Sequence, residues 1–394
     1  MNKETEKTEI GKGAIYDART LGTPRMLLLG LQHMFAMFGA TVLVPALTGL
    51  SVSTTLLFAG LGTLFFHFIS KGRVPAFLGS SFAYLAAYWA IAPNGEPELL
   101  PYACLGVFCS GLLYLLLAAL IKAFGVKRVM RFFPPIVTGP IIIAIGLNLS
   151  QSAIDNCATD WGIAIVAILV VIACNIWGKG MIKIIPIILG VVASYAVAAV
   201  LGKVDFTPVA EAAWIGFPIF LERTVFSIFQ NPDNSLILNS VLTIMPIALA
   251  TMVEHIGDIS AISSTVGENF IKNPGLHRTL TGDGLATMLA SLFGAPANTT
   301  YGENTGVLTL TKVYDPRVIR LAAYFAIIFS FCPKVSALIS CMPAATMGGV
   351  SLVLYGMISA VGVRNIVETR INFTESRNVL IAALILVLSI GINY

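Results

Sequence analysis

The chain of 394 residues contains thirteen stretches that are mostly apolar, and most of them are long enough to cross a membrane. A helix needs about 20 apolar residues to span the hydrocarbon core of a bilayer. Numbered as runs 1 to 13, the stretches are residues 26–49, 52–70, 75–93, 101–121, 135–153, 161–177, 184–201, 237–258, 281–294, 297–313, 318–340, 343–362 and 378–394. Charged residues make up only 11% of the chain, whereas roughly 25% is usual in soluble domains. The sequence therefore predicts an all-α polytopic membrane protein and excludes a soluble or disordered chain.

The Lys and Arg residues indicate how the runs are oriented. If the amino terminus lies in the cytoplasm and the runs alternate, 21 of the 24 basic residues fall on the cytoplasmic side and 3 on the other. Cytoplasmic segments of membrane proteins carry such an excess of positive charge. Run 9 is short and run 10 is rich in Thr, Asn and Gly, but leaving out either one would invert every later segment. We therefore expect both to cross as short or broken segments, with the amino terminus in the cytoplasm.

The two halves of the chain resemble each other at fixed offsets. Ser-Ser-Phe at 80–82 has a counterpart in Thr-Thr-Tyr at 299–301, 219 positions later, and Gln-His at 32–33 has one in Glu-His at 254–255, 222 positions later. Run n thus corresponds to run n+7. Because seven is an odd number of spans, the second copy of the repeat enters the membrane from the opposite side and is inverted. The pattern predicts a seven-plus-seven inverted-repeat transporter with two broken segments, in which runs 3 and 10 contain short strands.

The repeat predicts fourteen runs, and the sequence contains thirteen. The chain ends at Tyr394, directly after an apolar stretch and without a polar flank. We therefore expect the partner of run 7, the last segment, to be absent from this chain.

Four carboxylates lie at membrane depth: Glu254, Asp258, Asp283 and Glu303. A charged side chain at the bilayer centre costs about 2.5–3.5 kcal/mol, so it is expected to face a cavity or a partner. Glu254 and Asp258 share one helix face at spacing i, i+4, and one of two such close carboxylates should carry a proton near neutral pH. This predicts coupling to protons. The alternative is a structural polar network that holds helices together; His255, about 100° around the helix, is expected to be a packing histidine.

Run 10 has the features of a broken segment. Thr-Thr-Tyr at 299–301 favours a strand, Gly302 permits close backbone approach, and a helix can begin near Glu303. Run 3 repeats this order around Ser81 and Phe82. A strand that leads into a half-helix leaves backbone N–H groups free to bind a ligand. The alternative is that the glycines only allow close helix packing.

A site with such backbone donors and carboxylate acceptors suits a small planar solute that has both N–H and C=O groups. Phe82 or Tyr301 could cover the face of its ring. A simple anion suits the site poorly, because the carboxylates would repel it. An anion exchanger or channel on the same plan would need a cationic site.

Other classes of function are excluded by the sequence. Its basic residues are scattered, without the stripe that nucleic acid binding requires. The six cysteines form no CxxC pair, and no metal-ligand cluster, nucleophile–base pair or phosphate loop is present. We therefore expect no metal site and no enzymatic activity.

Three segments carry a resemblance to a known family. Residues 303–312, Glu-Asn-Thr-Gly-Val-Leu-Thr-Leu-Thr-Lys, resemble the signature of the nucleobase–ascorbate transporter family. Gln-His at 32–33 and Glu-His-Ile-Gly-Asp at 254–258 resemble further conserved parts of that family. The resemblance extends over nearly the whole chain. A glutamate at the head of the signature is similar to the uracil branch, and purine members tend to carry glutamine there. A xanthine or urate permease is the alternative within the family.

The resemblance implies two domains that move against each other, and a homodimer formed through the second of them. By analogy the parts are a cytoplasmic tail (1–25), a core domain (26–123 and 237–342), a gate domain (124–201 and 343–394) and an extracytoplasmic loop (202–236). The gate domain would be incomplete without the last segment. The implied activity is proton-coupled uptake of uracil or a related nucleobase across a bacterial-type inner membrane, with the proton as the only coupling species.

The resemblance also implies roles for particular residues. Glu254 and Glu303 would bind the N–H edge of the nucleobase, and the main-chain amides of Phe82 and Gly302 would bind its carbonyls. The remaining residues are those that line the pocket (Ser81, Tyr301 and Tyr355), those that couple protons (Glu254, Asp258, Asp283 and Glu303) and those that support the site (Gln32, His33 and Asn304). In the uracil-transporting member that this chain resembles, the position of Asp258 is a histidine, whereas other members have aspartate.

Overall fold

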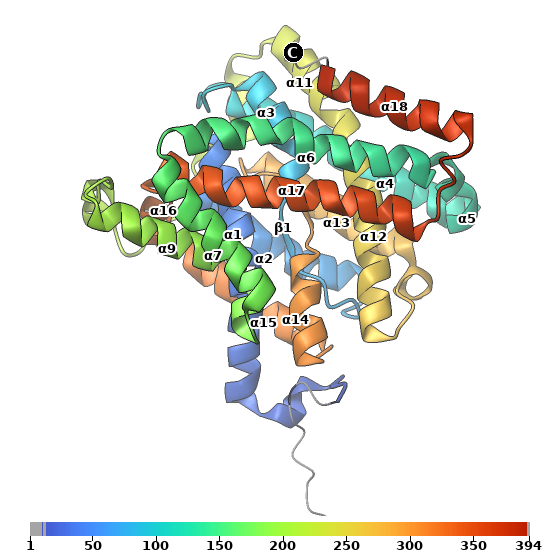
Figure 1. The fold of residues 1–394 in the computed structure, drawn as a ribbon, viewed down its shortest axis with the longest axis horizontal. Coiled ribbons are helices and arrows are strands. Elements are labelled where there is room, and N and C mark those ends of the chain that lie inside the picture. Colours follow the sequence, from blue (N-terminus) through green and yellow to red (C-terminus); the bar gives the residue numbers. More distant parts are fainter. Residues whose placement is uncertain (1–9, 11–12, 392–394) are drawn as a thin grey trace, which may run out of the picture.

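The computed structural model describes residue 10 and residues 13–391, apart from the side chains of Ile184 and Glu303 (Figure 1). Fifteen longer helices and one two-stranded sheet make up the described fold. The helices are α1 (Thr23–Thr48), α2 (Val52–Ile69), α3 (Leu85–Ile91), α4 (Leu100–Phe124), α6 (Pro135–Ala158), α7 (Trp161–Trp177), α9 (Pro186–Val200), α11 (Asn234–Ile244), α12 (Ala248–Val266), α13 (Leu276–Leu292), α14 (Glu303–Thr311), α15 (Pro316–Ser330), α16 (Pro333–Ser340), α17 (Ala344–Glu368) and α18 (Ser376–Gly391).

Short helical turns connect these elements. They are η1 (Ala18–Leu21), η2 (Phe82–Tyr84), α5 (Val126–Val129), η3 (Met130–Phe132), α8 (Met181–Ile184), α10 (Thr207–Glu211), η4 (Leu221–Arg223), η5 (Val225–Gln230), η6 (Met245–Ile247) and the π-helical turn η7 (Ile271–Gly275).

The described helices confirm the prediction of a polytopic membrane protein. Each of the thirteen predicted runs contains a helix. Six helices are long and apolar enough to cross a membrane, or seven if the bent pair α15 and α16 forms one span. Four shorter apolar helices add to these, among them α7 and α9.

Run 11 differs from the single stretch that the sequence predicted. The axes of α15 and α16 meet at 83°. Pro333 begins α16 and disfavours helical backbone at the preceding Cys332, which is extended, with φ −109° and ψ 91°. The apolar pattern alone could not reveal this break.

Helices of the two halves pack in corresponding pairs. α4 packs against α13 as α2 packs against α15, and α6 lies along α17. α7 contacts α17 in the same way that α18 contacts α6. These helices form runs 2, 4, 5 and 6 of the first half and runs 9, 11, 12 and 13 of the second. When each run n is replaced by run n+7, and each run n+7 by run n, the pair of α4 and α13 becomes the pair of α15 and α2. The pair of α7 and α17 becomes the pair of α18 and α6 in the same way. An inverted repeat requires this correspondence between the contacts of the two halves.

The predicted strands form where the halves meet. β1 (Leu78–Ser80) pairs antiparallel with β2 (Asn298–Thr300), with Gly79 opposite Thr299. A Cβ atom at Gly79 would lie 2.6 Å from Thr41 Oγ1 and 2.8 Å from the Tyr301 ring, so only glycine fits there.

Side chains complete the hydrogen bonding of this short sheet. The Tyr301 hydroxyl donates to the Ser80 carbonyl at 2.7 Å. Ser80 Oγ in turn donates to the carbonyl of Thr41 in α1 at 2.5 Å. Thr63 Oγ1 of α2 accepts the Leu78 amide at 2.9 Å. Backbone groups that three-residue strands cannot satisfy are thus paired inside the protein, as the interior of a membrane requires.

The segment before α1 is held against the loop between α14 and α15. We call residues 13–22 the N-terminal clasp. The Ile15 amide donates to the Lys312 carbonyl at 2.8 Å, and the Tyr314 amide donates to the Ile15 carbonyl at 2.8 Å. Tyr16 Oη donates to the carbonyl of Val266, the last residue of α12, at 2.9 Å.

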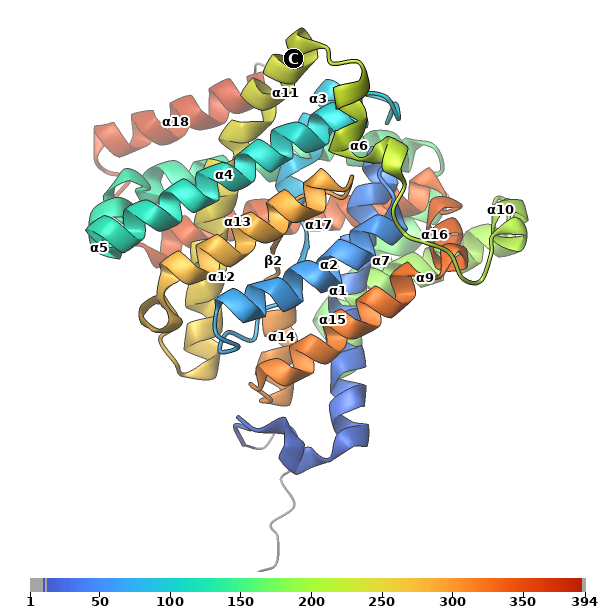
Figure 2. The same cartoon turned by 180° about the vertical axis from the view of Figure 1, so that it is seen from behind.

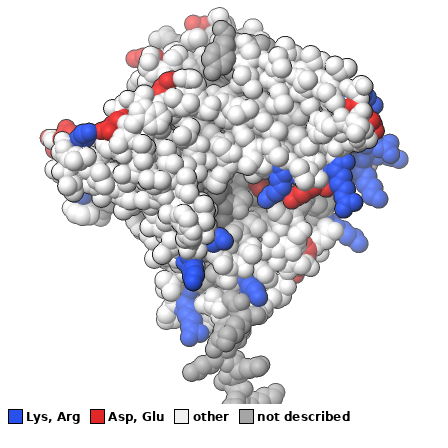
Figure 3. All heavy atoms as spheres, in the orientation of Figure 1, with Lys and Arg blue, Asp and Glu red and all other residues white. Residues whose placement is uncertain are grey.

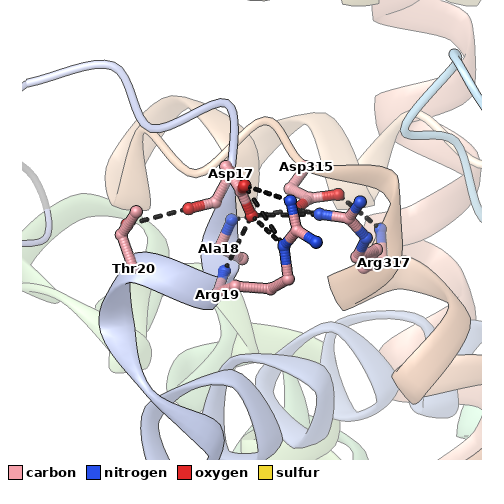
Figure 4. A network of polar contacts seen from close by, with 6 residues as sticks. All are labelled: Asp17, Ala18, Arg19, Thr20, Asp315 and Arg317. Carbon is pink, nitrogen blue, oxygen red and sulfur yellow. Dashed lines mark hydrogen bonds and ion pairs between the residues drawn. The ribbon is translucent and has the colours of Figure 1, made fainter.

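Charged groups lock the clasp in place (Figure 4). The buried Asp315 carboxylate accepts the Ala18 amide at 2.8 Å and Arg317 Nη1 at 3.1 Å. Arg317 Nη1 also donates to Asp17 at 3.0 Å. The hydrogen-bonded Arg19 guanidinium beside Asp17 holds the pKa of that carboxyl well below its usual range, so Asp17 stays ionised.

We predict that Asp315→Ala opens the N-terminal clasp. The substitution removes the acceptor of the Ala18 amide and of Arg317 together. A hydrogen bond to a charged group contributes about 1.5–3 kcal/mol. Tryptic cleavage after Arg19 should therefore become about tenfold faster or more, because cleavage requires local opening. Asp205→Ala is the matched control, since the exposed Asp205 carboxylate bonds to Thr207, two residues away, and lies outside the clasp. Equal cleavage rates in both variants would contradict the proposed lock.

We predict that Gly79→Ala destabilises the antiparallel pair formed by β1 and β2. The added methyl group would overlap Thr41 Oγ1 and the Tyr301 ring, and such overpacking costs about 1–3 kcal/mol. The midpoint of thermal unfolding in detergent should fall. Gly356→Ala should not lower it, because a Cβ atom at that position meets nothing within 4 Å. An unchanged midpoint for Gly79→Ala would show that the sheet tolerates a side chain there.

Candidate functional site

Each strand of the central sheet leads into a short helix. β1 continues through Ser81 into η2, which begins at Phe82, and then into α3; β2 continues through Tyr301 and Gly302 into α14. Because the strands are antiparallel, the two helices leave opposite ends of the sheet, with α3 above it and α14 below it in Figure 1. The first N–H groups of a helix have no partner within it. The fold therefore brings two sets of backbone donors toward one place.

One carboxylate of α12 lies beside the start of α14. A Cβ atom at Gly302 would lie 3.2 Å from Asp258 Oδ1, so the Asp258 carboxylate is next to the Gly302 backbone. Asp258 is half-buried, and Glu254 is exposed although α12 is part of a membrane-spanning helix. An exposed carboxylate at that depth indicates a cavity that admits water or a polar solute. Figure 3 shows this face of the molecule hollowed below α17, with acidic side chains beside the hollow.

Aromatic residues from α17 and η2 meet near the same place. The rings of Phe82 and Tyr355 form an edge-to-face pair with centroids 6.3 Å apart. Both side chains are buried, and the Tyr355 hydroxyl has no hydrogen-bond partner among the described residues. This pair joins the start of a half-helix to a helix outside the sheet region.

The predicted supporting residues connect α1 to α14. Asn304 Nδ2 donates to the His33 carbonyl at 3.2 Å and lies 3.3 Å from His33 Nδ1. His33 and Asn304 are buried, and Gln32 is half-buried. Gln32 Oε1 is enclosed and has no hydrogen-bond partner within the described part of the chain. The signature segment is thereby fixed to the first helix of the fold.

A polar cluster that sequence reasoning missed lies behind β2. His255 Nδ1 is 3.0 Å from Thr300 Oγ1 and 3.2 Å from Asp283 Oδ2. Thr300 Oγ1 donates to Asp283 Oδ1 at 3.1 Å. All three side chains are buried. His255 is therefore the packed residue that the sequence predicted, and it also connects α12 and α13 to β2. The repeated pair of hydroxyl residues in runs 3 and 10 was the one signal for Thr300.

The structure distributes the predicted coupling carboxylates over two environments. Asp283 is enclosed in the His255 cluster, whereas Glu254 is exposed. Glu303 is the first residue of α14, and its side chain lies outside the described part of the structure.

Two of the residues predicted to line the pocket, Ser81 and Tyr301, form hydrogen bonds that stabilise the sheet. The Ser81 amide donates to the Ala297 carbonyl at 3.0 Å. The Tyr301 amide donates to the Phe77 carbonyl at 2.9 Å, and the Tyr301 hydroxyl donates to Ser80. These groups therefore hold the frame from which the half-helices emerge.

Known structures share this fold. The transmembrane domain of a cyanobacterial bicarbonate transporter, BicA, superposes with a TM-score of 0.68 at 15% identity, over 96% of this chain and 98% of that one. SLC26A9 superposes with a TM-score of 0.67 at 12% identity, over 93% of this chain and 61% of that one. At such low identity these structures establish the fold alone.

Sequence relatives are much closer. The uracil permease of Bacillus caldolyticus is 43% identical over 386 residues, which cover 96% of this chain and 87% of that protein. The uracil permease of Escherichia coli K12 is 38% identical over 92% of this chain and 84% of that protein. A putative pyrimidine permease of the same organism, RutG, is 35% identical over 98% and 88%.

A family model described as the permease family matches residues 24–394, nearly the whole chain. That match and the close relatives confirm the resemblance carried by the signature at 303–312, and they mark a transporter rather than an enzyme. This multi-pass membrane protein therefore belongs to the permease family.

Proposed function

We propose that this chain carries uracil into the cell together with protons. The observation that carries the proposal is the exposed Glu254 of α12, which lies on the same helix face as Asp258, the residue that contacts the Gly302 backbone at the start of α14. Relatives about 40% identical over most of their length are named uracil permeases, which supports the choice of substrate.

Uracil matches the chemistry of this site. It is a small planar ring with N–H donors and C=O acceptors on its edges. The Glu254 and Glu303 carboxylates accept its N–H groups, and the amides of Phe82 and Gly302 donate to its carbonyls. The arrangement of both half-helices around one sheet supports this pairing, because each presents backbone N–H groups at its first turn. Ser81, Tyr301 and Tyr355 border the bound ring.

Proton coupling follows from the two carboxylates on α12. Glu254 and Asp258 share one face at spacing i, i+4, and two neighbouring carboxylates in a membrane resist carrying two negative charges. One proton shared by the pair favours uracil binding, and its release toward the cytoplasm weakens binding. Asp283 and Glu303 add further carboxylates to the network. The proton is the only coupling species in this mechanism.

Alternating access requires that two parts of the protein move against each other. In our proposal, residues 26–123 and 237–342 form a core domain, and residues 124–201 and 343–394 form a gate domain. The ring pair of Phe82 and Tyr355 connects these parts, which supports its role as a contact that opens and closes the site. A homodimer through the gate domain would hold the gate still while the core moves.

The proposed location is a bacterial-type inner membrane with the amino terminus in the cytoplasm. In Figure 3 most Lys and Arg side chains on this face gather on its lower half and one edge, and Figure 1 places the N-terminal clasp at the bottom. This distribution supports a cytoplasmic side at that end.

We predict that uracil uptake into proteoliposomes depends on an inward proton gradient. An uncoupler should abolish the uptake of radiolabelled uracil, and excess xanthine should not compete. Competition by xanthine would instead favour a purine permease. Uptake of an anion such as bicarbonate in place of uracil would favour an anion transporter on the same fold.

We predict that Glu254→Gln weakens uracil binding by about 10- to 150-fold, because a hydrogen bond to a charged group contributes about 1.5–3 kcal/mol. Equilibrium binding of labelled uracil measures the loss. Glu211→Gln, in the exposed α10, is the matched control. If Glu254→Gln binds like the unaltered protein, the substrate site lies elsewhere.

We predict that Asp258→Asn separates binding from proton coupling. The amide keeps the shape of the side chain beside Gly302 but cannot exchange a proton. The variant should still exchange labelled for unlabelled uracil across the membrane, while its net uptake no longer responds to a proton gradient. Full gradient-driven uptake by this variant would assign the coupling proton to another group.

A further inference from the structure

A cavity of about 390 Å³ is lined by residues of three helices. Figure 2 shows these helices, α2, α4 and α13, side by side. We call the cavity the α2–α4–α13 groove, and its lining is Ile69, Leu115, Ala118, Ala119, Lys122, His277, Arg278 and Thr281. The mechanism of transport uses none of these residues.

The polar end of the groove is cationic. Lys122 comes from the last turn of α4, and His277 and Arg278 come from the first turn of α13. Arg278 Nη1 donates to the Ile69 carbonyl at 3.3 Å, which fixes the guanidinium at the mouth of the groove. The lining residues include no carboxylate. A negatively charged group at this end would meet two permanent cations and a histidine.

The other end of the groove is apolar and opens toward lipid. Leu115, Ala118 and Ala119 form its floor on α4. Beside this floor a stripe of exposed apolar side chains recurs every four residues along the same helix: Leu112, Leu116, Leu120 and Phe124. A stripe at this spacing lies on one face of a helix. In a membrane that face contacts acyl chains, so the apolar end of the groove adjoins the lipid tails.

We propose that the α2–α4–α13 groove binds a phospholipid with an anionic headgroup. The phosphate lies between Lys122 and Arg278, within reach of His277, and one acyl chain follows Leu115 and Ala119 along α4. The two ends of the groove match the two ends of this molecule. A zwitterionic lipid fits less well, because its headgroup brings a cation to a site that already holds cations. Free phosphate would leave the apolar end unfilled. Basic pockets between membrane helices recognise acidic lipids in this way.

Native mass spectrometry of the full chain in detergent tests the proposal with phosphatidylglycerol and phosphatidylcholine as probes. The unaltered protein should retain phosphatidylglycerol in preference to phosphatidylcholine. Each removed cation should lower retention about fivefold, so Lys122→Gln combined with Arg278→Gln should lower it about 25-fold. The matched control is Lys179→Gln combined with Lys183→Gln, which removes one charge before α8 and one within it and should leave retention unchanged.

A second variant keeps the proposal testable if the loss of the Arg278 hydrogen bond disturbs folding. Ala119→Trp retains every charge and fills the floor of the groove, and it should also release phosphatidylglycerol. Three results would overturn the proposal: equal retention of both lipids, full retention by Ala119→Trp, or complete displacement of the lipid by millimolar inorganic phosphate. The last result would identify a phosphate site without a lipid tail.

Discussion

The crossing of two three-residue strands is the constraint on which the rest of this structure depends. A strand inside a membrane must pair all its backbone groups within the protein, since lipid offers no hydrogen bonds. β1 and β2 do this with each other and with hydroxyl groups from Thr63 and Tyr301. Because both strands are short, each can be followed by a helix that starts in the middle of the protein. The paired strands also join the two halves of the chain, because β1 belongs to the first repeat and β2 to the second. The candidate site therefore lies where the two repeats meet.

Much of this fold could be predicted from the sequence, because the strongest signals are long and repeated. The thirteen apolar runs, the two strands and the family each rest on patterns of many residues. Features that depend on a single residue or on distant contacts escaped prediction. Pro333 breaks run 11, and the N-terminal clasp pairs Asp17 and Ala18 with residues about 300 positions away. No local sequence pattern predicts contacts between residues so far apart in the chain.

The sequence could predict which residues belong to the candidate site, but it could not predict how exposed each of them is. Membrane depth singled out the carboxylates, since charged residues are rare in apolar runs. The position of these carboxylates within the apolar runs does not show that Glu254 is exposed, nor that Asp283 is enclosed with His255 and Thr300. That difference arises from which face of α12 or α13 meets β2. The buried His255 and the exposed Glu254 are neighbours in α12, so a rotation of about 100° around the helix separates the enclosed cluster from an exposed surface.

The N-terminal clasp has a consequence for the order in which the protein is built. The Ala18 amide and its acceptor Asp315 are 297 residues apart. At a synthesis rate of about 5–20 residues per second, roughly 15–60 s pass between the two leaving the ribosome. Throughout that time α1 is already available for insertion, while the segment in front of it has no partner of its own. The clasp can close only after α14 and α15 have been made, so residues 13–22 are made before α1 but take their final position after α15.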